Sequence, residues 1–217
     1  MSKIKIAPSI LSADFANMAQ EIKRIEQGGA DLVHCDVMDG VFVPNITFGI
    51  KMVEDIRKVT TLPLDVHLMI VHPEKYVEAF AKAGADYITV HWEACQDNLI
   101  DVLKLIKSTG KKCGAVINPD TPVEKIAEAV PYCDMILVMS VFPGFGGQKF
   151  IPEVLEKFTE LKKIIDKTEK NILLEIDGGV NRETVKKVIE YGVDIAVAGS
   201  AVFKAENIKE EIEFLKG

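Results

Sequence analysis

The feature that most constrains the fold is a regular alternation of two kinds of segment. Short runs rich in apolar and β-branched residues alternate with longer amphipathic stretches, a pattern typical of repeated βα units in a parallel sheet. Eight strands are predicted, over residues 4–8, 31–37, 63–69, 86–91, 112–117, 134–139, 172–177 and 193–198. Helices are predicted over residues 14–27, 49–59, 73–83, 97–109, 122–130, 152–167, 181–190 and 207–216.

Eight such units within 217 residues are compatible with few topologies. An open doubly wound sheet would need a glycine fingerprint after its first strand, and residues 8–12 contain no glycine. A closed barrel needs no such fingerprint and leaves no strand edge exposed. No linker or break in composition divides the chain. We therefore predict an α/β protein with a single (β/α)8 TIM barrel, formed by one domain over residues 1–217.

The charge and composition of the chain exclude several classes of partner. A net charge of −7, from 33 acidic and 26 basic side chains, offers no broad positive surface to nucleic acid or to an anionic membrane. No apolar run approaches the roughly 20 residues of a membrane-spanning helix, and the sequence passes from Met1, Ser2 and Lys3 directly into the first predicted strand. The four cysteines form no Cys-x-x-Cys pair, which indicates reduced thiols. We expect a cytoplasmic protein that binds neither nucleic acid nor membrane.

Histidine and aspartate side chains gather at the ends of three predicted strands. Because side chains alternate along a strand, His34 and Asp36 share one face of the second strand, and His67 lies on the matching face of the third. Asp177 ends the seventh strand. In a barrel these strand ends meet at the face that carries active sites. Two imidazoles and two carboxylates suit a divalent metal ion, although each side chain taken alone is also compatible with a buried structural role.

Other polar side chains on or beside these strands have two interpretations each. Asp65 and Glu175, lower on the same faces, either orient the ligand imidazoles or are simply buried polar partners. His91, at the end of the fourth strand, either lines the site or is a hydrogen-bonded structural histidine. His72 precedes a proline at a helix entry, and we expect it at the surface.

Glycine-bearing segments follow the last three predicted strands. They contain Gly144, Gly146 and Gly147 after the sixth strand, Gly178 and Gly179 after the seventh, and Gly199 followed by Ser200 after the eighth. Glycines let backbone N–H groups approach an anion closely, and the loops after the last strands of a barrel commonly bind phosphate. We therefore expect a phosphate site here, the alternative being that the glycines only form tight turns.

Three methionines also fall at predicted strand ends, namely Met38, Met69 and Met139. Flexible thioether side chains often fill gaps in a core. The other interpretation is a polarizable wall that faces a planar, electron-rich intermediate such as an enediolate.

Five motifs, spread over the chain, carry a resemblance to a known family. They are APSILSAD at residues 7–14, HCDVMDGVFVPN at 34–45, DVHLM at 65–69, PGFGGQ at 143–148 and DGG at 177–179. With these motifs in this order, the sequence resembles the ribulose-phosphate 3-epimerase family over essentially its whole length. The resemblance implies a barrel of the ribulose-phosphate-binding type and an isomerase of carbohydrate metabolism, in the pentose phosphate pathway. The expected reaction interconverts D-ribulose 5-phosphate and D-xylulose 5-phosphate.

The resemblance also implies a cofactor and a set of site residues. The cofactor is one divalent metal ion, usually zinc, with iron, manganese or cobalt as alternatives, held by His34, Asp36, His67 and Asp177. The implied substrate-binding residues are Ser9, His67, Gly144, Phe145, Gly146, Gly147, Asp177, Gly178, Gly179, Gly199 and Ser200. The implied partner is a small sugar phosphate, and the family suggests a homo-oligomer.

The expected chemistry needs two proton carriers. Inverting a carbon next to a ketone removes a proton on one face and returns one on the other, and Asp36 and Asp177 from separate strands suit this task. A metal ion would polarise the C2 carbonyl and the C3 hydroxyl and stabilise a cis-enediolate. We therefore predict metal-assisted two-base proton transfer at C3.

Three other functions fit parts of this pattern. An epimerase for a six-carbon ketose phosphate, such as allulose 6-phosphate, would use the same cradle and the same acid/base pair. A catalytically silent barrel would bind metal or sugar phosphate without turnover, and intact Asp36 and Asp177 disfavour it. A lyase or decarboxylase that uses Asp and Lys is disfavoured by the paired His34 and His67.

Overall fold

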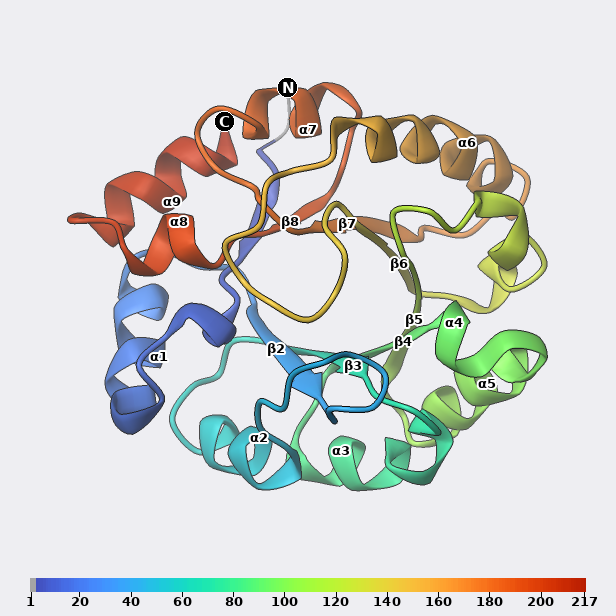
Figure 1. The fold of residues 1–217 in the computed structure, drawn as a ribbon, viewed down its shortest axis with the longest axis horizontal. Helices are drawn as coiled ribbons and strands as arrows, with labels where there is room; N and C mark the ends of the chain where they lie inside the picture. Colours follow the sequence, from blue (N-terminus) through green and yellow to red (C-terminus); the bar gives the residue numbers. More distant parts are fainter. Residues whose placement is uncertain (1–2) are drawn as a thin grey trace.

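A computed structural model describes residues 3–217, in which eight parallel strands form a ring with helices outside it (Figure 1). The strands are β1 Lys5–Ala7, β2 Val33–Met38, β3 Leu64–Met69, β4 Tyr87–His91, β5 Lys112–Ile117, β6 Met135–Met139, β7 Leu173–Asp177 and β8 Ile195–Val197. Each lies within one residue of its predicted segment or inside it, so all eight predicted strands are confirmed. Met1 and Ser2, which the predicted domain includes, lie outside the described residues.

Parallel pairing runs around the ring in the order β1-β8-β7-β6-β5-β4-β3-β2. The remaining junction, between β1 and β2, is closed by a few hydrogen bonds. The N–H of Asp31 donates to the carbonyl of Ile6 at 3.0 Å, and the N–H of His34 donates to that of Pro8 at 3.1 Å. The Asp31 carboxylate accepts the N–H of Ile6 at 2.8 Å. These bonds complete the predicted (β/α)8 barrel.

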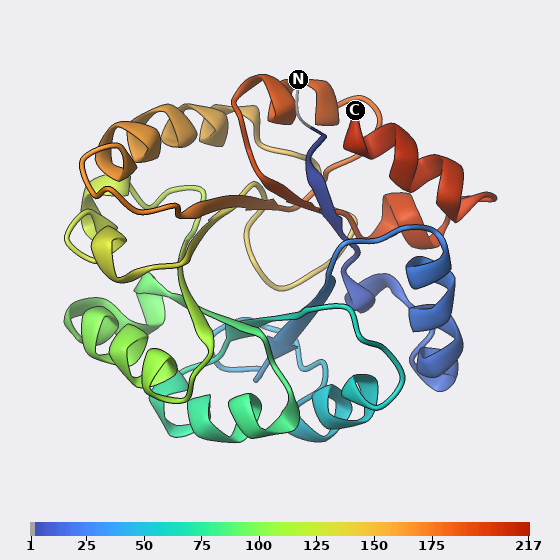
Figure 2. The same ribbon diagram turned by 180° about the vertical axis from the view of Figure 1, so that it is seen from behind.

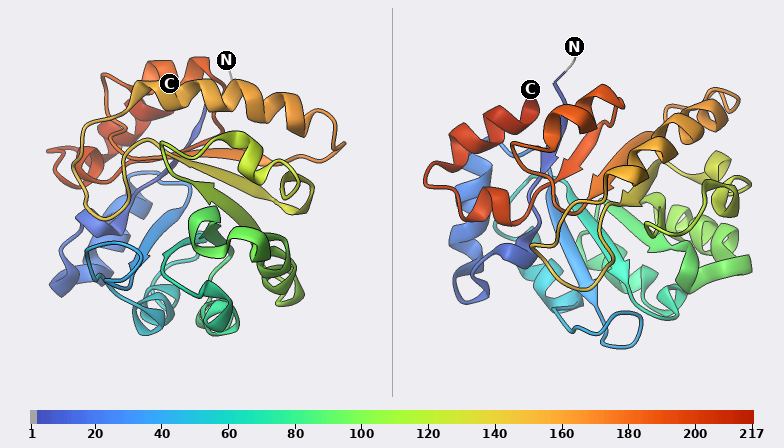
Figure 3. Two further views of the ribbon diagram at one scale, coloured as in Figure 1. Left: turned by 45° about the vertical axis from the view of Figure 1, so that its right-hand side comes forward. Right: turned by 45° about the horizontal axis from the view of Figure 1, so that its top comes forward.

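Helices cover the outside of the ring, as the two tilted views of Figure 3 show. They are α1 Met18–Gln27, α2 Ile50–Arg57, α3 Val77–Ala83, α4 Trp92–Cys95, α5 Leu99–Ser108, α6 Glu156–Ile165, α7 Val185–Glu190, α8 Ser200–Phe203 and α9 Ile208–Lys216. Short 3-10 turns are η1 Ile10–Ser12, η2 Phe15–Asn17, η3 Pro73–Lys75, η4 Gln96–Asn98, η5 Val123–Ile126, η6 Val130–Tyr132 and η7 Pro152–Leu155. Within residues 3–217, no helix has the length and apolar character needed to cross a membrane.

The helix predicted over residues 122–130 is wrong. The segment forms the two turns η5 and η6 instead. Pro122 and Pro131 flank the segment, and neither has the backbone N–H that a continuous α-helix would use for its hydrogen bonds. The four-residue helices α4 and α8 were not predicted, because a single turn leaves no helical period in the sequence.

The two faces of each strand meet different surroundings. On β2, Val33, Cys35 and Val37 belong to the large apolar cluster between strands and helices, whereas His34 and Asp36 point into the ring. Figure 2 shows the ring from behind. One apolar cluster inside the ring includes the first residues of β4, β6 and β8 and extends to Val197 at the end of β8. Its members are Ala7, Leu32, Tyr87, Met135, Ile195 and Val197. Polar side chains are therefore concentrated in the middle and at the carboxyl end of the ring.

Candidate active site

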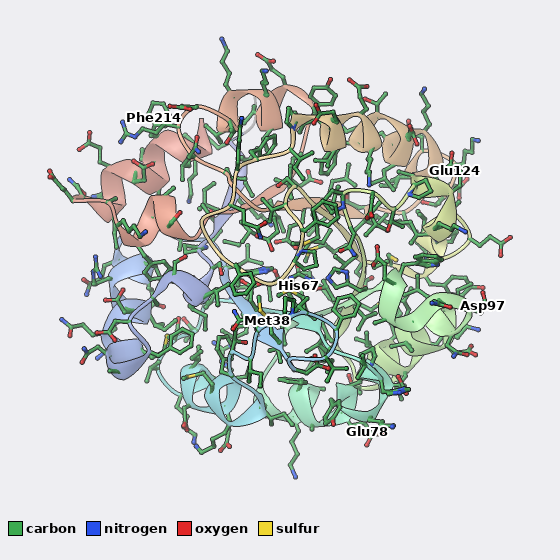
Figure 4. The ribbon with its side chains drawn as sticks, viewed as in Figure 1. Met38, His67, Glu78, Asp97, Glu124 and Phe214 are labelled. Atoms are coloured by element: carbon green, nitrogen blue, oxygen red, sulfur yellow. The ribbon has the colours of Figure 1, made fainter. Side chains whose placement is uncertain are left out.

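The four predicted metal ligands converge at the carboxyl end of the strands. β2 supplies His34 and Asp36, β3 supplies His67, and β7 supplies Asp177. The nitrogens His34 Nε2 and His67 Nδ1 each lie 3.2 Å from Oδ1 of Asp36. Oδ2 of Asp177 lies 3.8 Å from the first nitrogen and 3.7 Å from the second. Figure 4 shows His67 near the centre of the ring, beside Met38, far from Glu78 and Asp97 at the rim.

The spacing of these atoms fits a divalent ion. All four donor atoms lie within 4.8 Å of one another. A tetrahedral zinc ion with bonds of about 2.0–2.2 Å would separate its ligands by roughly 3.3–3.6 Å. The measured separations of 3.2, 3.2, 3.7 and 3.8 Å are close to this range. Mixed imidazole and carboxylate donors also suit zinc, iron and manganese. The cluster can therefore hold a metal ion.

The two aspartates of the cluster differ in their affinity for a proton. Burial, and then the charge of Asp36, raises the pKa of Asp177 to about 7. Burial also disfavours the charged form of Asp36, but the charge and hydrogen bonds of His34 and His67 outweigh it and hold the pKa of Asp36 well below its usual range. The Ser9 hydroxyl donates to Oδ2 of Asp36 at 2.5 Å. Near neutral pH, one carboxylate is charged while its partner exchanges a proton.

A second layer of carboxyl groups lies deeper in the ring. Nδ1 of His34 is 2.5 Å from Oδ2 of Asp65, and both side chains are fully buried. A hydrogen on Nδ1 directed at Asp65 leaves Nε2 free to face the cluster, which favours the orienting role for Asp65. Neither carboxyl oxygen of Glu175 has a hydrogen-bond partner among residues 3–217. Burial, together with the charge of Asp65, raises the pKa of Glu175 well above its usual range, so this side chain is a neutral acid.

A cavity opens above the cluster at the carboxyl end of the ring. The predicted site residues that line it are Ser9, Asp36, Met38, Met69, Met139, Gly144, Phe145, Gly146, Gly147, Asp177, Gly178, Gly179, Gly199 and Ser200. His34 and His67 are fully buried and do not belong to this lining. Ser12, Val141 and Val197 also line the cavity and were not predicted. The two valines are ordinary core residue types, and Ser12 was not part of a glycine-bearing segment.

The glycine pair after β7 has a backbone conformation that a side chain would oppose. Gly178 has φ +121°, and a Cβ there would lie 2.5 Å from Val141 Cγ2. Gly179 has φ +65°, and a Cβ there would lie 2.8 Å from the backbone nitrogen of Phe150. Glycine at these positions keeps the backbone close to the neighbouring segment and free of side-chain atoms on the cavity wall.

The segment after β6 crosses the mouth of the ring, as Figure 1 shows in yellow. Nδ2 of Asn45 donates to the carbonyl of Gly144 at 2.8 Å, which links the segment to the loop after β2. Nε2 of Gln148 donates to the carbonyls of Phe142 at 2.6 Å and Phe145 at 2.9 Å. The contact of Asn45 was not predicted, because 99 residues separate the partners and no spacing rule joins them.

The remaining two histidines, His91 and His72, lie outside the cavity lining. His91 is fully buried, and its Nε2 lies 2.8 Å from Nε2 of His67. Its Nδ1 lies 3.1 Å from Oε2 of Glu93, and burial lowers the pKa of His91 to about 4. His91 is therefore a hydrogen-bonded structural histidine and does not line the cavity. The side chain of His72 is 65% exposed, as predicted.

Comparison with known proteins gives consistent matches. Residues 5–203 match the model of the ribulose-phosphate 3 epimerase family. The ribulose-phosphate 3-epimerase of Bacillus subtilis is 55% identical over 215 residues, which cover 99% of each chain. The enzyme of that name from Synechocystis is 54% identical over 98% of this chain and 93% of its own. The chloroplastic ribulose-5-phosphate-3-epimerase of Arabidopsis thaliana is 48% identical over 99% of this chain and 77% of its own.

Solved structures with similar backbones are more distant in sequence. A structure of KGPDC from Streptococcus mutans has a TM-score of 0.75 at 14% identity and covers 99% of this chain and 95% of its own. The 3-hexulose-6-phosphate synthase from Salmonella typhimurium has a TM-score of 0.70 at 16% identity, with 99% and 96% covered. At such low identities the likeness concerns the fold alone.

Proposed function

Because the chain belongs to the ribulose-phosphate 3-epimerase family, we propose that it interconverts D-ribulose 5-phosphate and D-xylulose 5-phosphate by inverting the configuration at C3. The chain is an isomerase, and the names of its relatives support the pentose phosphate over a six-carbon ketose phosphate. One observation carries the proposal for this chain. Asp36 and Asp177 face one cavity from β2 and β7, with pKa values displaced in opposite directions.

The proposed reaction uses this difference between the two aspartates. The Asp36 carboxylate removes the proton from C3 on one face of the substrate, and the Asp177 carboxylic acid returns a proton on the opposite face. In the reverse direction the two residues exchange roles. In the metal-free site the pKa of Asp177 is about 7, which supports a carboxyl group that gains and loses a proton near the working pH. The short hydrogen bond from Ser9 supports the charged form of Asp36 between turnovers.

We further propose that His34, Asp36, His67 and Asp177 hold one divalent ion, zinc by preference, with iron, manganese or cobalt as alternatives. The donor set and the separations between the donor atoms support this assignment. When bound, the ion would polarise the C2 carbonyl and C3 hydroxyl of the substrate. The hydrogen bond between His34 and Asp65 supports a free Nε2 on His34 for this purpose.

The substrate is proposed to bind with its phosphate among the glycine-bearing segments. Backbone N–H groups of residues 144–147, 178–179 and 199–200 would donate to the phosphate oxygens. Such a site needs no cluster of basic side chains, which suits a protein with a net charge of −7. The proposed positions of Ser9 and His67 are near the polar chain of the sugar. Met38, Met69 and Met139 would form an apolar wall against the planar enediolate, and their shared cavity supports this role.

At the level of the whole chain, the proposal is one catalytic domain over residues 1–217, located in the cytoplasm and assembled as a homo-oligomer. The single ring of strands supports one domain. Exposed apolar side chains at Val41 and Ile46, which are 72% and 74% accessible, support association between copies. The acidic net charge supports the absence of nucleic-acid and membrane partners.

Two assays test this function. The first compares the turnover of ribulose 5-phosphate with that of allulose 6-phosphate. The second measures turnover before the metal is removed with a chelator, after its removal, and after single metals are added back. We expect the five-carbon substrate to be preferred, the chelated protein to be inactive, and zinc to restore turnover. Faster turnover of allulose 6-phosphate would contradict the proposed substrate. Full activity after chelation would contradict the proposed metal.

A further inference from the structure

His67 has two neighbours that compete for the single hydrogen of its neutral ring. Oδ1 of Asp36 lies 3.2 Å from Nδ1, and Nε2 of His91 lies 2.8 Å from Nε2. A ligand nitrogen must carry a lone pair and no hydrogen. The Asp36 carboxylate alone would draw the hydrogen to Nδ1, which is the nitrogen that faces the other ligands. A second group must therefore hold the hydrogen on Nε2 if His67 is to bind metal.

We propose that Glu93 and His91 are positioning residues that hold the hydrogen of His67 on Nε2, so that Nδ1 presents its lone pair to the metal ion. The inference rests on the proposed function, in which His67 is a ligand. It adds two residues that the metal and substrate sites do not include.

The direction of the hydrogen bonds follows from Glu93. Its Oε1 accepts the N–H of Asn118 at 2.8 Å and the hydroxyl of Thr121, which is the arrangement of a carboxylate. Its Oε2 lies 3.1 Å from Nδ1 of His91. Since a carboxylate only accepts, His91 carries its hydrogen on Nδ1 and offers the Nε2 lone pair to His67. The opposite tautomer would set a lone pair of the fully buried His91 against the half-buried carboxylate of Glu93, which is unfavourable.

The surroundings fix the ring of His91 in this arrangement. His67 and His91 are both fully buried, and their ring planes differ by 22° with centroids 5.0 Å apart. This geometry suits an edge-to-edge hydrogen bond between ring nitrogens. The ring of Phe42 packs against His91 at a centroid distance of 4.8 Å. Glu93 is itself held by the two donors on its other oxygen, so neither partner is free to turn away.

A comparison with His34 shows what the pair supplies. The second nitrogen of His34 meets the carboxylate of Asp65 directly at 2.5 Å. The second nitrogen of His67 meets a carboxylate only through the intervening ring of His91. Both arrangements end on a carboxyl group, and such partners commonly set the tautomer of a metal-binding histidine.

The experiment measures zinc affinity by competition with a chromophoric chelator, together with nitrogen NMR of the zinc-loaded protein with labelled histidines. Glu93→Gln keeps the shape of the side chain but places an amide donor beside His91, and it should weaken zinc binding roughly 10–100-fold. Activity should fall at limiting zinc and recover with excess zinc, which a general loss of structure would not produce. The NMR spectrum of the wild-type protein should show the hydrogen of His91 on Nδ1.

The matched control is Thr89→Val on β4, the strand that carries His91. Thr89 is fully buried, two residues before His91, and its hydroxyl has no hydrogen-bond partner among residues 3–217. This variant should bind zinc as the wild-type protein does. Unchanged zinc affinity in Glu93→Gln, or a hydrogen on Nε2 of His91, overturns the positioning role.

His67→Asn separates the inference from the function on which it rests. Loss of zinc affinity in His67→Asn but not in Glu93→Gln contradicts the positioning pair alone. Full zinc affinity in His67→Asn contradicts the ligand role itself, and the inference falls with it.

Discussion

At the scale of single residues, the site depends on two aspartates whose surroundings differ more than their sequence context suggests. Asp36 lies between two imidazoles and a serine hydroxyl, which stabilise its charged form. Asp177 is disfavoured in its charged form by burial and by the negative charge of Asp36. Strand alternation predicted that both would point into the barrel. The difference in their pKa values depends on distances between strands, which the sequence does not contain.

This difference predicts how zinc affinity changes with pH. Below a pH of about 7 a proton on Asp177 competes with the ion, so the affinity should rise as pH increases toward that value. Burial lowers the pKa of His34, but Asp36 and Asp65 outweigh it and hold that pKa well above its usual value. Zinc should therefore displace about two protons below pH 7 and about one just above it.

Calorimetric titration of the metal-free protein with zinc, in buffers of different ionisation enthalpy, measures the number of protons released. A zinc affinity that does not change from acidic to mildly alkaline pH would contradict the protonation states assigned to Asp177 and His34.

At the scale of secondary-structure elements, the strands were predictable and some helices were not. The strands are marked by buried runs of apolar and β-branched residues, and β2, β3 and β7 carry the side chains that were predicted for the metal site. The segment over residues 122–130 has an amphipathic pattern but does not form an α-helix. Pro122 and Pro131, at its two ends, lack the backbone N–H that helical hydrogen bonds need. The partnership of His67, His91 and Glu93 joins β3 to the start of α4, and neither spacing nor residue type revealed it.

The contact between the loops after β2 and β6 leads to a prediction for substrate binding. Asn45→Ala removes the hydrogen bond to the carbonyl of Gly144. One such bond is worth about 0.5–1.5 kcal/mol, so KM and the dissociation constant of inorganic phosphate should rise roughly 2–10-fold. Zinc affinity should not change, because Asn45 lies outside the ligand cluster.

Steady-state kinetics and phosphate competition measure these effects, with Asn98→Ala at an exposed position as the control. If Asn45→Ala kept the wild-type KM and phosphate affinity, the contact would have no part in shaping the cradle.

At the scale of the whole molecule, the barrel separates stability from chemistry. One end of the ring is closed by an apolar cluster, and the other end holds the polar side chains of the site. A net charge of −7 offers an anionic ligand no broad positive surface, and the glycine-bearing segments lie at the cavity, where backbone N–H groups are available instead. The junction between β1 and β2 is closed by only a few backbone hydrogen bonds. An alternating sequence pattern cannot reveal that this junction differs from the other seven.

Metal binding should stabilise the whole barrel, because ligands from β2, β3 and β7 meet at one point. At a free zinc concentration about 100 times the dissociation constant, linkage predicts a gain of about 2.7 kcal/mol. For a chain of this size each kcal/mol raises Tm by about 2–4 °C, so Tm should rise by roughly 5–11 °C. Calorimetric scans of metal-free and zinc-loaded protein measure this rise in Tm.

The variant for comparison is His67→Asn, which should show little shift in Tm with zinc. An equal shift in wild-type protein and in His67→Asn would place the stabilising ion somewhere else.

The central claim is that Asp36 and Asp177 move a proton at C3 from opposite faces. Its most direct test is incorporation of solvent deuterium at C3 of ribulose 5-phosphate, measured by NMR for wild-type protein, Asp36→Asn, Asp177→Asn and the exposed control Asp101→Asn. We predict incorporation in the wild-type and control proteins, and a loss of turnover of at least about 100-fold in each site variant. Near-normal turnover in either site variant, or turnover without deuterium at C3, would contradict the two-base mechanism.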